Sequence, residues 1–218
     1  MRIACVTYRD WALNIYDTLA RTTPHTILIV RSREQYDEEA IIRFKPDLAL
    51  FYGWSWKVGN EMLNACDCIM LHPASLPKYR GGSPIQNQVI AGERTSAATL
   101  FVMTDEIDAG PIIAQEPLSF EGHLDEILER ITEAGLRLTR HIIDAGYTPT
   151  PQRDADATYV KRRSPKDSEI TPTELSTATA AQLYDKIRVL EDPYPNAFIR
   201  TADGKRLLIK RAEIASDG

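Results

Sequence analysis

Three short apolar runs decide the fold class of this 218-residue chain: TILIV at residues 26–30, DLALFYG at 47–53 and CIMLH at 68–72. Each run has the length and the apolar character of a strand that is buried in a parallel sheet. Residues 2–7 (RIACVT) read as a further strand, and helices are expected between the strands, over residues 10–20 and 34–45. Strands that alternate with helices predict an α/β fold with a doubly wound, mainly parallel sheet.

The next part of the chain extends this pattern. Residues 98–104 and 111–118 look like a strand pair that is separated by Asp-Glu-Ile-Asp-Ala-Gly. Apolar residues then recur at helical spacing, which predicts one long helix over residues 124–143.

Beyond this helix the chain changes character. It becomes rich in Pro, Thr and Asp, which is typical of an extended linker. A short helix over residues 180–190 and a hairpin that turns at Asp203-Gly204 follow. We therefore expect a main domain over residues 1–145. Residues 146–218 are expected to form a linker and a small C-terminal helix-plus-hairpin subdomain.

The composition argues against several classes of function. A net charge of −5 disfavours a long-lived contact with a nucleic-acid backbone, which needs a basic surface. No apolar run approaches the roughly 20 residues that span a bilayer, so we expect no membrane partner. No Gly-x-Gly-x-x-Gly sequence follows the first strand and no P-loop lysine motif occurs, which argues against the usual modes of dinucleotide and nucleotide binding.

The three cysteines, Cys5, Cys66 and Cys68, lack the even count and spacing of a disulfide-rich secreted protein. We therefore expect free thiols and a cytoplasmic protein. Cys66-Asp67-Cys68 offers two metal ligands, but no second Cys/His pair stands at a zinc-like spacing. The prediction is small buried thiols and no metal site.

Candidate functional residues gather in HPASLPKYRGGSPIQNQVIAG at residues 72–92, where prolines, paired glycines and an arginine predict a loop without a regular element. His72 stands at the expected end of a strand, which is the edge where doubly wound sheets bind ligands. Asp108 also stands near the end of a strand, beside Gly and Pro. Either residue alone also fits a structural role, His72 as a satisfied histidine and Asp108 as a turn residue. Together they predict a paired acid–base site.

HPASLPKYRGGSPIQ resembles the signature loop of the 10-formyltetrahydrofolate-dependent formyltransferases. The family's motif is Ser-Leu-Leu-Pro, an aromatic residue, a basic residue and Gly, and residues 75–81 match it with a shift of register at one leucine. Residues 108–112 match the family's Asp-x-Gly-x-Ile, and Asp108 follows His72 by 36 residues, as expected of the family's catalytic pair. The resemblance covers residues 1–145.

This resemblance implies a Rossmann-like formyltransferase fold and transfer of a formyl group from 10-formyltetrahydrofolate, the co-substrate, to an amine without a metal. It implies that His72 stabilises the oxyanion and moves protons, and that Asp108 orients His72 and favours its charged form. By the same resemblance, six residues are expected to contact the folate: Trp54, Trp56, Arg80, Val102, Thr104 and Asp105. The tryptophans also fit core packing, and Arg80 also fits a solvated surface.

One position departs from the family's pattern. The family has Asn-x-His, and Met70 stands where its asparagine helps to hold the oxyanion. Methionine donates no hydrogen bond, and the loss of one such donor lowers a rate by about a hundredfold or more. Gln86 and Asn87 are the candidates for a substitute donor, and both also fit ordinary polar loop positions. The alternatives are low activity or a non-catalytic folate-binding relative.

The nature of the acceptor is predicted from the end of the chain. Residues 161–170, and residues 187–190 together with 193–195, resemble segments that the sugar and methionyl-tRNA formyltransferases share. The chain ends after one hairpin, where the methionyl-tRNA enzymes continue into a β-barrel, and its charge balance is acidic. We therefore expect a nucleotide-linked amino sugar as acceptor. The alternatives are a methionyl-tRNA enzyme of reduced size, with tRNA as partner, and a hydroxylamine formyltransferase of siderophore assembly.

The apolar residues of 180–214 also predict an assembly. A lone two-stranded hairpin is marginally stable in water, and pairing with a second copy covers both its apolar side chains and its open edge. We expect a homodimer through this region, with a monomer whose hairpin folds onto its own sheet as the alternative.

Overall fold

The computed structural model describes residues 1–215, and a six-stranded sheet in the order β2–β1–β3–β4–β6–β7 forms its centre. Its strands are β1 (Arg2–Val6), β2 (Thr26–Val30), β3 (Leu48–Leu50), β4 (Asp67–His72), β6 (Thr95–Val102) and β7 (Ile112–Ser119). The first four strands are parallel to one another, and β6 and β7 are antiparallel to their neighbours. The predicted α/β fold with a mainly parallel sheet is therefore confirmed.

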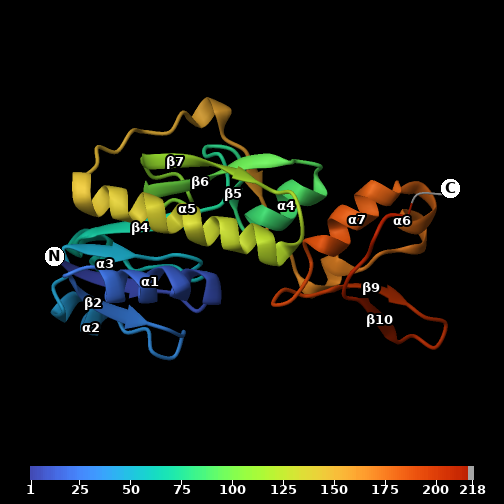
Figure 1. The fold of residues 1–218 in the computed structure, drawn as a ribbon, viewed down its shortest axis with the longest axis horizontal. Coiled ribbons are helices and arrows are strands. Elements are labelled where there is room, and N and C mark those ends of the chain that lie inside the picture. The colour runs from blue at the N-terminus through green and yellow to red at the C-terminus, as the bar shows by residue number, and fades with distance from the viewer. Residues whose placement is uncertain (216–218) are drawn as a thin grey trace.

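Helices cover both faces of the sheet, because successive residues of these apolar strands point to opposite sides. The covering helices are α1 (Asp10–Thr22) and α5 (Leu124–Ala145) on one face, and α2 (Glu38–Arg43) and α3 (Asn60–Ala65) on the other. Figure 1 shows α1 and α5 lying side by side. Each face has its own buried cluster, with Ile15 and Ile131 in the first and Ile41 and Met62 in the second.

Two elements differ from their expected form. β2 is the edge strand of the sheet and is mostly half-buried, because only β1 pairs with it. The prediction of a fully buried strand at residues 26–30 is therefore wrong. The helix expected over 34–45 is shorter, since α2 begins only after Asp37, whose side chain accepts a hydrogen bond from the Ala40 amide. Asp37 is thus an N-cap, which sets the start of the helix.

The prediction that residues 72–92 contain no regular element is also wrong. Arg80–Gly81 forms the short strand β5, and Pro84–Ile90 forms the helix α4. Proline fits the first helical position, where its missing N–H removes no intrahelical hydrogen bond. Ile85 and Val89 bury one side of α4 in the main cluster. Residues 73–79 are irregular, as expected.

The predicted linker is ordered by pairing with the main domain. Thr150 forms an isolated bridge with Ile112, and β8 (Tyr159–Val160) pairs in parallel with β5. Figure 1 shows this segment passing along β7 toward β5 before it reaches the C-terminal elements. Residues 158–163 thereby come to lie against the segment 77–83 that follows His72.

The C-terminal elements gather at the end of the molecule opposite the N-terminus (Figure 1). They are η2 (Pro165–Ser168), α6 (Pro172–Thr177), α7 (Ala180–Arg188), β9 (Ala197–Arg200) and β10 (Arg206–Ile209), whereas η1 (Asp154–Asp156) belongs to the linker segment near Arg80. β9 and β10 form the predicted hairpin, and Gly204 has a φ of 79°, which favours glycine in its turn. Ile187 and Leu190 belong to the same buried cluster as Ile15 and Ile131, so α7 and the residues that follow it pack against the main domain.

A buried ion network also fixes α7 to the main domain. Asp185 accepts a hydrogen bond of 2.8 Å from Arg188 and two hydrogen bonds, of 2.6 and 2.9 Å, from Arg94. Arg188 donates further to the carbonyl oxygens of Phe120 and Gly122. The side chains of Arg188 and Asp185 are 1% and 6% exposed. Each charge is therefore removed from water and balanced by the other inside the protein.

Cys5 and Cys68 are buried, Cys66 is half-buried, and all three are free thiols, as predicted. Within residues 1–215, no helix combines the length and the apolar character that crossing a membrane requires. In the same part of the chain, no three His, Cys, Asp or Glu side chains gather as a metal-binding group. The cytoplasmic location stays a prediction.

Candidate active site

His72 and Asp108 meet at the end of β4. His72 is the last residue of that strand and is 5% exposed. Its Nδ1 lies 3.6 Å from Asp108 Oδ2, and its Nε2 lies 2.9 Å from the Tyr79 carbonyl oxygen. Both ring nitrogens therefore face acceptor oxygens, and the imidazolium donates to both whereas the neutral ring donates to one. This arrangement suits a group that gains and releases a proton during a reaction.

The backbone around this pair is held in an unusual conformation. Asp108 has a φ of 52°, and Tyr79 and Ser83 have φ values of 59° and 54°, in the left-handed region that residues other than glycine rarely adopt. Strained residues of this kind gather at functional sites. The Gly81 amide donates a hydrogen bond of 2.7 Å to Asp108 Oδ2, which fixes the carboxylate beside His72.

The turn between β6 and β7 contains three predicted folate contacts. Val102 is the last residue of β6 and is half-buried, and Thr104 and Asp105 are exposed. Gly110 lets the turn close, because a Cβ there would lie 1.7 Å from the Val102 carbonyl oxygen. Met103 packs in the second hydrophobic cluster. The turn thus exposes the polar Thr104 and Asp105 together with Ile107, which is 71% exposed, and is anchored by its methionine.

The two tryptophans that follow β3 form an aromatic cluster with Tyr8, which follows β1. The ring centroids of Trp54 and Trp56 are 4.7 Å apart, and the Tyr8 ring lies 4.9 Å from Trp56. Trp54 is 6% exposed, and its Nε1 has no hydrogen-bond partner among residues 1–215. Trp56 is 41% exposed. Trp54 therefore belongs to the core of that face, and Trp56 offers an aromatic surface to solvent.

Three arginines surround this aromatic cluster. The guanidinium carbon of Arg9 lies 4.5 Å from the Tyr8 ring centroid, and that of Arg33 lies 5.7 Å from the Trp56 ring centroid. Arg162 donates a hydrogen bond of 2.9 Å to the hydroxyl of the serine between the two tryptophans. In a chain of net charge −5, these groups concentrate positive charge at one place. Guanidinium groups suit the recognition of phosphate.

Met70 lies on the same face of β4 as His72, because side chains two residues apart point to the same side of a strand. It is half-buried and packs against the second cluster, which also contains Trp54. A thioether therefore stands on the His72 side of the strand, at the position where the resemblance leads one to expect an amide donor.

The structure distinguishes the two candidate oxyanion donors, both of which lie on α4. Asn87 Nδ2 donates to the carbonyl oxygens of Gly82 and Lys161, at 2.9 and 3.0 Å, so its two amide hydrogens tie the loop to the linker. Gln86 is 3% exposed, and its Nε2 has no partner in the part of the chain that the structure describes. The Gln86 side chain lies beside the Tyr194 hydroxyl: burial raises the pKa of that hydroxyl, and the contact with Gln86 partly offsets the rise. Buried amides are nearly always hydrogen-bonded, and Nε2 of Gln86 has donor capacity to spare at this place.

Arg80, a predicted folate contact, is buried, with 1% of its side chain exposed. Its guanidinium donates to Gln152 Oε1 at 3.0 and 2.9 Å, to the Tyr159 hydroxyl at 2.8 Å and to Asp154 at 2.9 Å. The interpretation of Arg80 as a solvated residue is therefore wrong, and its donors serve the linker rather than an open site. Sequence reasoning missed Gln152, because no local pattern marks it within a segment that reads as a linker.

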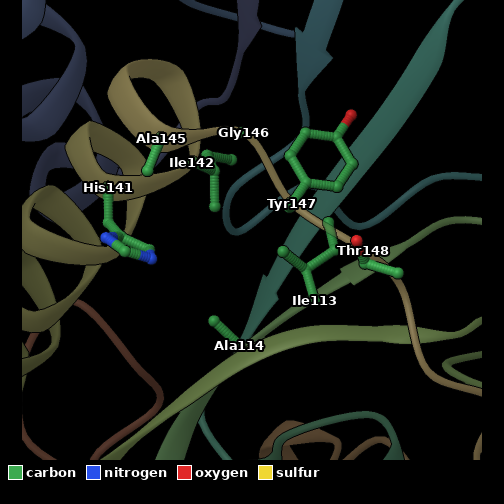
Figure 2. Close-up of a pocket in the computed structure, with 8 residues that line it drawn as sticks. All are labelled: Ile113, Ala114, His141, Ile142, Ala145, Gly146, Tyr147 and Thr148. Carbon is green, nitrogen blue, oxygen red and sulfur yellow. The ribbon is translucent and has the colours of Figure 1, made fainter.

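Two surface cavities lie away from this site. One, of about 330 Å³, lies between β7 and the end of α5, and Figure 2 shows His141 and Tyr147 on opposite sides of it. Its lining residues are Ile113, Ala114, His141, Ile142, Ala145, Gly146, Tyr147 and Thr148. The other, of about 620 Å³, is lined by C-terminal residues together with His123 and Tyr184. The predicted catalytic pair lines neither cavity.

The chain is similar to known proteins over most of its length. A family model described as "Formyl transferase" matches residues 15–140, which is more than half of the chain. The methionyl-tRNA formyltransferase of Acidiphilium cryptum is 32% identical over 151 residues, which are 68% of this chain and 48% of that protein. The chain spans about half the length of the curated relatives that it matches.

Solved structures give the same result for the fold. A methionyl-tRNA formyltransferase from Clostridium thermocellum superposes with a TM-score of 0.90 at 27% identity, over 99% of this chain and 94% of that chain. A 4-N formyltransferase from Francisella tularensis superposes with a TM-score of 0.77 over 99% and 98% of the two chains. At 19% identity, this second likeness shows the fold alone.

Proposed function

The chain belongs to the formyl transferase family, and on that premise we propose that it transfers a formyl group from 10-formyltetrahydrofolate to an amine. The family that residues 75–81 and 108–112 predict is thereby confirmed, and N-formyltransferase activity is the part that we propose. The observation that carries the proposed activity is the buried His72, whose Nδ1 lies 3.6 Å from Asp108 Oδ2 at the end of β4.

In the proposed reaction, the neutral amine attacks the formyl carbon. A new nitrogen–carbon bond forms, and the bond between the formyl carbon and the folate nitrogen breaks. Since Nδ1 faces Asp108, the proton donor is Nε2, which exchanges its contact with the Tyr79 carbonyl oxygen for the oxygen that gains negative charge. The ring then passes the proton that the amine loses to the leaving nitrogen. Asp108 orients the ring through Nδ1. Their separation of 3.6 Å is longer than a hydrogen bond, and such contacts commonly tighten when substrate is bound.

We assign the second oxyanion donor to Gln86 rather than to Asn87. The support for Gln86 is its buried, unpartnered Nε2, within the residues that the structure describes. Asn87 is less suited, because both of its amide hydrogens are engaged by backbone carbonyls. With this assignment the chain retains a side-chain donor although Met70 replaces the asparagine.

The proposed place of the pterin ring is the aromatic cluster beside the turn at residues 102–105. A planar ring stacks favourably on an aromatic face, and Trp56 offers one that is 41% exposed. Trp54 supports the Trp56 ring from the core, where the two ring centroids lie 4.7 Å apart. Met103 packs in the same cluster as Trp54, so the turn and the tryptophans border one region.

The proposed acceptor is the amine of a nucleotide-linked amino sugar. Arg9, Arg33 and Arg162 offer cationic groups for its phosphates, close to the aromatic cluster. A second candidate is methionyl-tRNA, which the names of the curated relatives favour and which also carries phosphates. Salt distinguishes the two, because many phosphate contacts make the binding of a nucleic acid steeply salt-dependent.

A panel of acceptors tests this proposal. The protein is incubated with 10-formyltetrahydrofolate and, in separate reactions, a nucleotide-linked amino sugar, methionyl-tRNA and a hydroxylamine. Release of tetrahydrofolate is followed, and the formylated product is identified by mass spectrometry. Turnover with the sugar alone is expected. Turnover with methionyl-tRNA or the hydroxylamine assigns the acceptor to that class instead, and folate binding without turnover on any acceptor contradicts the proposed activity.

A further inference from the structure

Gln152 connects the strained turn of Asp108 to the loop that follows His72. Its Nε2 donates to the Asp108 carbonyl oxygen at 2.8 Å and to the Gly110 carbonyl oxygen at 2.7 Å. Its Oε1 accepts from Arg80 Nε at 3.0 Å and from Arg80 Nη2 at 2.9 Å. One side-chain amide therefore makes four hydrogen bonds between two segments that are not adjacent in the sequence.

The orientation of this amide is determined by the chemistry of its partners. A guanidinium group only donates, and backbone carbonyls only accept, so the amide oxygen must face Arg80 and the NH₂ group must face the turn. Arg80 itself cannot move away, because its side chain is 1% exposed and is also bound by Tyr159 and Asp154. The turn is thus tied to a buried, fixed cation.

The contact between Gln152 and the turn acts on Asp108, whose backbone is strained. Asp108 has a φ of 52°, and a strained conformation persists only where the surrounding structure determines it. The amide of Gly81, the residue next to Arg80, holds the Asp108 carboxylate from the other side at 2.7 Å. Residues 80–81 therefore fix both the backbone of Asp108, through Gln152, and its side chain directly.

We propose that Gln152 is a positioning residue, which keeps Asp108 beside His72 by anchoring the carbonyl groups of its turn to Arg80. It touches neither His72 nor the reacting atoms, and it lies outside the residues 15–140 that the family model matches. This role rests on the proposed function of the His72–Asp108 pair. Its physical part, the anchoring of Asp108, is open to a measurement that needs no activity.

That measurement is hydrogen exchange of two neighbouring backbone amides. The Gly81 amide is protected by the Asp108 carboxylate, and the Arg80 amide by the Thr158 carbonyl oxygen at 2.8 Å, a contact that Gln152 does not make. In Gln152→Met, which keeps the length of the side chain and removes its hydrogen bonds, exchange at Gly81 should accelerate about tenfold. Exchange at Arg80 should stay unchanged, which shows that the β5–β8 pairing is intact.

Unchanged exchange at Gly81 would overturn the positioning role. Equal acceleration at both amides would also overturn it, because that result describes a general loosening of β5 and β8. Neither outcome depends on formyl transfer, so a failure of the proposed function is distinguishable from a failure of this proposal.

Kinetics supply the second test. Gln152→Met should lower kcat by about tenfold to a hundredfold with the acceptor KM unchanged, as is common when a group that orients a catalytic residue is lost. Gln152→Glu should do the same, because it keeps the contact with Arg80 but presents no donor to the two carbonyls. Arg153→Ala removes the exposed side chain next to Gln152, which pairs with Asp156 and not with Arg80, so it is the matched control and should retain wild-type kcat.

A double variant separates positioning from a structural role. In an Asp108→Ala background, Gln152→Met should lower kcat no further, because its effect acts through Asp108. A second loss of the same size in that background would contradict the proposal.

Discussion

Gln86 is the residue on which the proposed oxyanion site depends, because Met70 offers no donor. Replacing a single oxyanion donor lowers kcat by about a hundredfold or more, so we expect a loss of this size in Gln86→Ala. Asn87→Ala is the matched control, since that amide is engaged by Gly82 and Lys161 and its loss should change kcat only slightly. Steady-state rates of tetrahydrofolate release measure both.

Met70→Asn provides the complementary test. In the Gln86→Ala background, it should restore part of the lost kcat, because it returns a donor to the same face of β4 as His72. A Gln86→Ala variant with wild-type kcat would contradict the assignment and leave His72 and the backbone as the groups that hold the oxyanion.

For single residues, the sequence identifies those that belong to a local motif. His72 and Asp108 stand beside prolines and glycines that mark the ends of strands, and the structure brings them together. The sequence does not distinguish Asn87 from Gln86, because the partner that engages Asn87, Lys161, lies 74 residues away. The burial of Arg80 has the same cause, since Gln152 reaches it from the linker.

Helix α7 depends on Asp185, which neutralises Arg188 inside the protein. Removing one partner of a buried pair leaves an uncompensated charge, so Asp185→Ala should lower the free energy of unfolding by about 3 to 5 kcal/mol. Asp17→Ala removes the partner of Arg31 in a pair that is exposed, and it should change that free energy by about 1 kcal/mol or less. Urea denaturation compares the two variants, and equal losses would contradict the role given to Asp185.

Helix α6 is joined to α7 by Glu174 and Lys186, whose Oε1 and Nζ are 2.6 Å apart. Burial opposes ionisation of Glu174, but hydrogen bonds from Lys186 and Thr171 prevail and hold its pKa below the ordinary value of 4.5. A lowered pKa in the folded state means that the contribution to stability is present above pH 4.5 and is lost as the pH falls through the lower, folded value.

Glu174→Gln should therefore weaken the acid dependence of stability and leave the protein less stable near neutral pH. Unfolding measured by urea between neutral pH and the acid range checks both effects. An acid dependence identical to that of the wild type would contradict this account of the α6–α7 contact.

Helices and strands are predicted correctly where a local sequence pattern defines them. They are not predicted correctly where pairing with a distant segment determines their place. The helices expected over 10–20, 124–143 and 180–190 are present, because their apolar spacing is sufficient. The position of β2 at the edge depends on the strand order, which no single run encodes. β5 exists only because residues 159–160 of the linker pair with it.

The whole molecule presents an open edge at its C-terminal end. Leu207, Leu208 and Ile214 are 56%, 49% and 49% exposed, and within residues 1–215 β10 pairs with β9 alone. We propose that a second copy of the chain covers this hairpin, because association removes both the apolar surface and the free edge. The homodimer is a proposal that the exposed leucines support.

Leu207→Asp/Leu208→Asp should convert that dimer into a monomer with an unchanged fold, since both side chains are exposed in the single chain. Light scattering at micromolar concentration gives the mass, and circular dichroism reports the fold. Deleting the hairpin is a poorer test, because Ala197 and Phe198 of β9 are buried. A wild-type mass near that of one chain, 24.6 kDa, would reject the dimer.

Direct formyl transfer at His72 and Asp108 is the central function proposed for the whole molecule. With an isotopic label in the formyl carbon of 10-formyltetrahydrofolate, the label should appear as an amide on the amino sugar when the wild-type protein is present. His72→Ala and Asp108→Ala should each slow this transfer by about a hundredfold or more, and the double variant should lose little more than either. His141→Ala, which changes an exposed histidine of α5 outside the proposed site, should transfer the label at the wild-type rate. Transfer at the full rate by either single variant of the pair would contradict the account.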